Sequence, residues 1–374
     1  MNRLTSGLAR ALGAIAGAVL MVRGAAAQSP VSAGAGSYVE TYNFSDPSAA
    51  GMKRVSLLTI PWSAEFQPMR WAQVVIRGAF ASGVVDRTDG TQGKISGLTD
   101  TELSLSVPLV QDRVIMAASL MLPFGKATYS PEEAQVAGII AADLLPFSLT
   151  HWGSGGSLDL STQAAGTLGA LNVGARVGYQ MGREYELLQQ DRFSYHPGGQ
   201  LYARIAADGD IGESRMAGQL TVYTFGDDQR NSQNLYRTGN RVQALLTYSM
   251  PTGRTGRLQT YLGALRREHG TFADGSPETP AQTMVLVGGG LRQPFRYGVL
   301  IPLVDIRLVS SNDGLGQGYI GDAGLTAELP VFGGSATLLP VLRARIGTIK
   351  VRAGVESGIT GFELGAGLRL GGSR

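Results

Sequence analysis

The feature that most constrains this chain is an alternation of apolar and polar residues with a period of two, repeated along most of its length. In the segment 242–250, for example, Val242 and Leu246 fall on one face of an extended chain, and Gln243 and Ser249 fall on the other. A helix would bring residues three or four apart onto one face, whereas a strand brings every second residue there. Roughly sixteen segments follow the strand pattern, so the sequence predicts an all-β protein.

Two arginines near the C-terminal end show what the two faces must contact. In "LLPVLRARIG" (338–347), a strand places Arg343 and Arg345 on one face and Leu342 and Ile346 on the other. Backbone polar groups inside a bilayer must all be hydrogen-bonded, which requires a sheet that closes on itself. In such a barrel the leucine face meets lipid and the arginine face meets a wet interior.

The connections between the strand segments support a barrel. Tight turns, as at 251–256, alternate with long polar loops at 84–97, 183–199, 226–239, 267–280 and 347–361. Outer-membrane barrels have short periplasmic turns and longer extracellular loops, and nothing imposes this on a soluble β-sandwich. We therefore predict a transmembrane antiparallel up-and-down barrel of about sixteen strands, with twelve to sixteen plausible because short segments can merge.

One segment departs from the strand pattern. Ser130 stands where a helix N-cap is expected, Pro131 follows at the first helical position, and Glu133 completes a capping box. This predicts one short helix near 131–145 in a long outer loop, either folded into the barrel mouth or serving only as a cap.

The first residues have the features of an export signal. Arg3 and Arg10 precede a short apolar stretch, 11–22, which is followed by small residues up to Ala27. A membrane anchor is the alternative, but the apolar stretch is shorter than the ~20 residues that a span needs. We expect 1–27 to be cleaved and 28–374 to form a single barrel domain in the outer membrane.

Removal of this signal changes the charge balance. The signal contains three arginines and no acid, so the Lys and Arg total falls from 32 to 29, equal to the 29 Asp and Glu residues. A nucleic-acid partner requires a clustered basic excess, so none is expected. The expected partners are outer-membrane lipid and a small-molecule solute, and the oligomeric state is left open.

Residues for catalysis or metal binding are scarce. The chain has no cysteine and three scattered histidines, so we expect no metal site and no cofactor. His151 with Ser154 is the one pairing that resembles a nucleophile and a base, and it lacks a companion acid. We therefore predict that the protein is not an enzyme.

The predicted strands also give a set of charged residues on the inward face. Two roles are open for it: a lattice of ion pairs that stiffens the wall, and a constriction that selects anionic or polar solutes. The candidate lumen-lining residues are Arg77, Arg176, Arg204, Asp305, Arg307, Glu328, Arg343, Arg345, Glu363 and Arg369.

The segment 96–126, "SGLTDTELSLSVPLVQDRVIMAASLMLPFGK", resembles a broad family of outer-membrane barrels. It contains a turn "GLTDTEL", a strand ending in "VPL" and a second strand ending in "LPFGK". Members are often described as transporters linked to phenol meta-pathway degradation. The resemblance implies a passive route for small hydrophobic compounds and about a dozen strands, which is fewer than the alternation predicts.

These observations favour an outer-membrane channel or passive transporter for small solutes, with hydrophobic and anionic cargo both open. The alternative is a structural or surface-interaction barrel with a plugged lumen, whose outer loops bind another molecule.

Overall fold

The structure is a computed structural model that describes residues 31–69, 71–110, 113–190, 193–312, 316–352 and 355–371. The predicted signal peptide, 1–27, lies outside the described residues. Within them, no helix is both long enough and apolar enough to cross a membrane.

The described chain forms a closed antiparallel barrel. β1 pairs with β2 on one side and with β23 on the other, so the sheet has no open end. The wall strands are β1 (Val31–Phe44), β2 (Met52–Met69), β3 (Ala72–Arg87), β4 (Gln92–Leu98), β5 (Thr101–Leu109), β6 (Val114–Leu122), β7 (Ser157–Leu168), β8 (Leu171–Gly182), β11 (Gln200–Ile211), β12 (Ser214–Phe225), β15 (Arg241–Thr252), β16 (Gly256–Arg267), β19 (Gln282–Phe295), β20 (Gly298–Ser311), β21 (Gly318–Val331), β22 (Ala336–Arg352) and β23 (Val355–Leu370).

Seventeen strand segments build this wall, but two of them share one position. β4 pairs with the Phe80–Asp86 part of β3, and β5 pairs with the Gln73–Arg77 part of the same strand. The chain between them, Thr99 and Asp100, joins the two segments end to end. Counting β4 and β5 as one leaves sixteen positions around the barrel, which confirms the predicted fold and its strand number.

The two faces of the wall differ as the alternation predicts. On β22, the side chains of Leu342 and Ile346 are exposed, with relative exposures of 56% and 67%, whereas Arg345 is 4% exposed. Arg343 stands opposite Glu363 of β23, and Arg345 stands opposite Asp322 of β21. Leucine and isoleucine therefore form the outer, lipid-facing surface, and the arginines point toward charged partners on the concave side.

Because the outer face of the wall is apolar, a charged residue placed on that face should strongly destabilise the barrel. We expect Leu342→Arg to lower the free energy of unfolding of the lipid-embedded barrel by about 2–4 kcal/mol, because an arginine at mid-bilayer depth loses its hydration. Leu342→Phe is the matched control and should be nearly neutral. Urea titration of the barrel refolded into lipid vesicles measures both values, and equal stability of the two variants would contradict the assigned faces.

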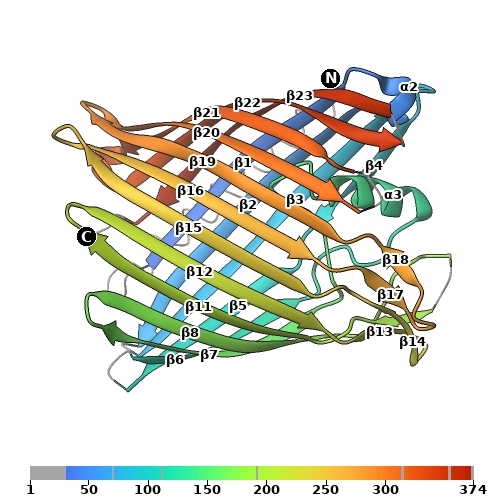
Figure 1. The fold of residues 1–374 in the computed structure, drawn as a ribbon, viewed down its shortest axis with the longest axis horizontal. Helices are drawn as coiled ribbons and strands as arrows, with labels where there is room; N and C mark the ends of the chain where they lie inside the picture. The colour runs from blue at the N-terminus through green and yellow to red at the C-terminus, as the bar shows by residue number, and fades with distance from the viewer. Residues whose placement is uncertain are drawn as a thin grey trace.

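The two ends of the barrel carry different connections. Figure 1 shows tight hairpins at one end and the helices and short strands at the other. At the second end, short strands form a separate six-stranded sheet: β9 (Tyr185–Glu186), β10 (Ser194–His196), β13 (Asp227–Arg230), β14 (Gln233–Arg237), β17 (Gly270–Phe272) and β18 (Pro277–Thr279). The polar loops predicted at 183–199, 226–239 and 267–280 thus contain paired strands of their own.

Two predicted loops are wrong. The segment 84–97 is mostly strand, because β3 continues to Arg87 and β4 begins at Gln92. The segment 347–361 was expected to be a long loop, but β22 continues to Arg352 and β23 begins at Val355. Here Ile349 and Ile359 share the inner face with Arg345 and Glu363 and pack at the main hydrophobic cluster, so the apolar residues change face and the alternation of the mid-strand is broken. Two further short elements are α2 (Pro47–Ala50) and a 3₁₀ turn, η1 (Phe332–Gly334).

The predicted helix is present as α3 (Pro131–Ile140) and is shorter than 131–145. Ser130 is the N-cap, and its reciprocal hydrogen bonds with Glu133 complete the capping box. Beyond Ala141 the chain turns and directs Leu144 and Leu145 into a buried cluster. Pro146 disfavours helical geometry at Leu145, which is consistent with this early end.

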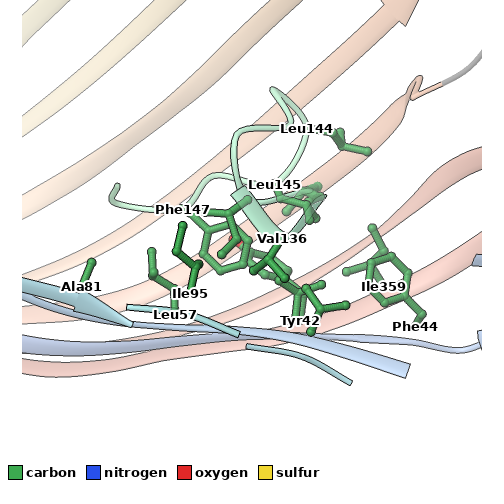
Figure 2. Packing of buried hydrophobic residues seen from close by; sticks show 14 of the residues in the cluster. Tyr42, Phe44, Leu57, Ala81, Ile95, Val136, Leu144, Leu145, Phe147 and Ile359 are labelled. Carbon is green, nitrogen blue, oxygen red and sulfur yellow. The ribbon is translucent and has the colours of Figure 1, made fainter. Parts of the chain in front are cut away.

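The segment that contains α3, residues 123–156, packs against the concave side of the wall. Its Val136, Leu144 and Phe147 meet Tyr42 and Leu57 of β1 and β2 in the main hydrophobic cluster of the described chain (Figure 2). We call this segment the inner loop.

The inner loop and the wall are in close contact at one glycine. A Cβ at Gly83 of β3 would clash with Cδ1 of Ile140 and would lie 3.2 Å from Cη2 of Trp152. A larger residue at position 83 would push the inner loop away from the wall.

Candidate functional site

Polar contacts attach the C-terminal part of the inner loop to the wall. Trp152, whose side chain is fully buried, donates from Nε1 to the carbonyl of Ala81 (3.1 Å). Ser148 donates to Glu40 Oε2 from its backbone N–H (2.8 Å) and from its hydroxyl (2.5 Å). The loop is therefore held by directional bonds as well as by apolar packing.

Glu40 belongs to a buried charge cluster centred on Arg345. The Arg345 guanidinium donates to Asp322 Oδ2 (2.9 Å), Glu363 Oε2 (2.5 Å), Glu40 Oε1 (3.2 Å) and the Tyr42 hydroxyl (2.7 Å). One arginine thus makes ion pairs with carboxylates from three strands, β1, β21 and β23. Because Glu40 also accepts from Ser148, this cluster connects the wall to the inner loop.

The cluster continues along the wall as a mixed charge network. Arg343 Nε lies 3.7 Å from Glu363 Oε2. Asp305 of β20 stands directly opposite Asp322 of β21, and like charges in that position destabilise a sheet unless cations compensate them. This arrangement supports the ion-pair-lattice interpretation for this part of the wall.

A second charge cluster lies where the inner loop meets β15, β16 and β20. Arg267 Nη1 lies 3.2 Å from Asp143 Oδ2, and Arg307 Nη1 donates to the Asp143 carbonyl (2.9 Å). Arg241 stands directly opposite Arg267, and Arg267 stands opposite Gln282. Arg241, Arg267 and Arg307 are called the arginine row below.

The wall formed by β7, β8, β11 and β12 carries a further polar group on the same face. Arg176 donates to the Ser161 hydroxyl (2.9 Å), and its guanidinium lies 5.5 Å from the centroid of the Tyr202 ring. Arg204 donates from Nε to the Thr221 hydroxyl (3.1 Å). The Arg176 side chain keeps an exposed fraction of 33%, so water reaches this part of the wall.

Near the tight-turn end, the inward charges form simple ion pairs. Arg77 Nε lies 2.7 Å from Glu102 Oε2, and Arg292 Nη2 lies 2.6 Å from Glu328 Oε2. The exposed fraction of the Arg77 side chain is 62%. Exposed pairs of this kind contribute little stability, so these two pairs add little to the strength of the wall.

The six-stranded outer sheet lies beyond the wall and contains a buried polar pair. The Tyr195 hydroxyl donates to Asp228 Oδ2 (2.5 Å). Burial, together with the neighbouring Asp228 carboxylate, raises the pKa of Tyr195 well above its ordinary value. The phenol therefore stays protonated and holds β10 against β13.

The structure brings the ten candidate residues into several separate groups. Arg343, Arg345, Glu363 and Asp305 lie in or beside the buried cluster, and Arg307 contacts the inner loop. Arg176 and Arg204 lie on neighbouring strands opposite one another. Arg77 and Glu328 have separate ion-pair partners, and Arg369 is exposed on β23.

Sequence reasoning missed Glu40, Asp322, Asp143, Arg241 and Arg267. The first two lie in strand segments whose alternation is weakened by glycine or by a polar neighbour, so their phase was not assigned. Arg241 and Arg267 lie at strand ends, next to predicted loops. For Asp143 the sequence has no usable signal, because its position depends on how the inner loop folds back.

Comparison with known proteins gives the fold and nothing finer. No family model matches the chain, and no curated protein matches its sequence. Among solved structures, OprB of Pseudomonas putida at high pH is similar with a TM-score of 0.52 and 10% identity, covering 91% of this chain and 94% of that chain.

Two other solved structures are less similar to this chain than OprB is. Pseudomonas aeruginosa OccK2 gives a TM-score of 0.44 at 12% identity, over 92% of this chain and 98% of that one. An outer membrane channel from Pseudomonas putida F1 gives 0.40 at 13% identity, over 75% and 94%. The OprB likeness and the closed sixteen-stranded wall together identify the fold as that of outer-membrane β-barrels.

Proposed function

We propose that the protein is a passive channel for small solutes in the outer membrane, formed by a single barrel domain once residues 1–27 are removed. The proposal rests on one observation: charged side chains on the concave face of the closed wall remain exposed to water. Arg77 and Arg176 keep exposed fractions of 62% and 33% there. A lumen filled by protein would bury such groups.

The inner loop narrows this lumen on one side. It packs on β1 to β4 and on β20, β21 and β23, and its Asp143 contacts Arg267 of β16, so the remaining path runs along β7 to β12. The proposed lining of that path includes Arg176 and Arg204 from the candidate set. The buried members, Arg345 and Glu363, act in the proposal as supports for the loop.

The relationship to barrels of phenol meta-pathway degradation is also part of this proposal. It rests on the segment 96–126, which contains the end of β4, the strands β5 and β6, and the first residues of the inner loop. The proposed cargo is a small hydrophobic or anionic compound, and the polar character of the path favours compounds with a charged or polar group.

Conductance across a planar lipid bilayer tests the proposal. The full chain, refolded and inserted into the bilayer, is expected to give stable ion currents in KCl, and liposomes that contain it should swell in solutions of small neutral solutes. A barrel plugged for a surface-interaction role would give neither signal. Heat-dependent migration on gels serves as the control that the inserted protein is folded.

A further inference from the structure

The arginine row has more hydrogen-bond donors than the structure satisfies. The Nε atoms of Arg241, Arg267 and Arg307 are all buried and have no hydrogen-bond partner among the described residues. The neighbouring Gln282 is 9% exposed, and its Oε1, an acceptor that cannot itself bind a carboxylate, also has no partner within the same part of the chain. Unpartnered buried polar atoms carry a free-energy cost and require an explanation.

Repulsion between neighbouring guanidinium groups adds to this free-energy cost. Arg241 and Arg267 stand directly opposite one another on β15 and β16, a position in which like charges repel. Asp143 supplies one carboxylate for three guanidinium groups, and its carboxylate contacts Arg267 while its carbonyl contacts Arg307. The repulsion within the arginine row is therefore only partly relieved by the protein itself.

Asp143 contacts the arginine row as a carboxylate from a bound ligand would. Its side chain is 38% exposed, and it reaches the row from the inner loop, a separate part of the fold. Guanidinium groups bind carboxylates through paired, charge-assisted hydrogen bonds. We propose that the arginine row is a binding site for the carboxylate group of small organic anions, and that Asp143 occupies it as an internal stand-in.

An aromatic ring lies next to this site. The Arg241 guanidinium lies 5.3 Å from the centroid of the Phe225 ring. An anion with a planar apolar group can therefore place its carboxylate on the arginine row and its ring near Phe225, so benzoate is a suitable probe. The inference names a ligand class for the proposed channel and rests on that function, but its test does not require conduction.

The test is benzoate binding to the full chain folded in detergent, measured by equilibrium dialysis. We expect saturable binding that R241Q/R267Q weakens about tenfold or more, since charge-assisted hydrogen bonds are lost. R257Q is the matched control, because Arg257 lies on the same face of β16 and bonds Ser249 (2.5 Å) far from the inner loop. Benzyl alcohol, which has the ring without the carboxylate, should bind poorly to every variant.

Asp143→Asn provides a second, opposite readout. Loss of the internal carboxylate should strengthen benzoate binding several-fold, since the competing charge is gone. No saturable binding to the folded wild type, or equal binding to R241Q/R267Q and R257Q, would overturn the inference. Absent bilayer currents together with normal benzoate binding would instead overturn the channel function alone.

Discussion

Arg345→Ala is expected to destabilise the barrel by about 3–5 kcal/mol, because it leaves buried carboxylates without their cation. The side chains of Arg345 and Glu40 are 2% and 1% exposed, and those of Asp322 and Glu363 are 4% and 10% exposed. Water cannot replace the guanidinium at this depth. The midpoint of urea unfolding, followed by tryptophan fluorescence, measures the loss.

Two further variants separate charge compensation from packing. Arg369→Ala removes an exposed arginine from the neighbouring strand and should change stability by less than about 0.5 kcal/mol. Arg345→Met combined with Glu40→Gln, Asp322→Asn and Glu363→Gln should recover most of the loss, because a neutral buried cluster needs no cation. If Arg345→Ala unfolds at the same urea concentration as Arg369→Ala, the account of the buried cluster is wrong.

Trp152→Ala is expected to loosen the inner loop while the wall stays folded. Truncation of a fully buried tryptophan costs about 3–5 kcal/mol, and here it also removes the bond to the Ala81 carbonyl. The wall strands keep their hydrogen-bond partners, so the cost falls on the loop. Single-channel recordings should show larger and noisier currents than those of the wild type.

Phe124→Ala is the matched control for this variant, since Phe124 lies in the same loop and is 62% exposed. Its currents should equal those of the wild type. A folded Trp152→Ala barrel with unchanged conductance would mean that the inner loop does not limit the lumen.

Much of the wall could be predicted from the sequence, because a barrel strand repeats a local rule. Every second residue faces lipid, so Leu342 and Arg343 reveal their faces without knowledge of their neighbours. The capping box at Ser130 is equally local, and it marked the start of α3 correctly. The sequence does not predict that β4 and β5 occupy one wall position together. That arrangement arises because β4 pairs with one part of β3 and β5 pairs with another part of the same strand.

The charge cluster and the arginine row depend on contacts that no local rule contains. Arg345 and Glu40 are 305 residues apart and meet only because the first and last strands close the barrel. Asp143 meets Arg267 and Arg307 only because the inner loop folds back against the wall. Alternation gives the face of a side chain, whereas its partner depends on closure and on loop packing.

Accessibility of single cysteines in lipid vesicles tests the central claim most directly, and the absence of native cysteine makes the experiment clean. Gln219 shares the inner face of β12 with Thr221, while Leu220 lies on the outer face with 39% exposure. We predict that a water-soluble maleimide labels Gln219→Cys rapidly and leaves Leu220→Cys unlabelled. Labelling of Leu220→Cys with protection of Gln219→Cys would contradict a water-filled barrel with an apolar exterior.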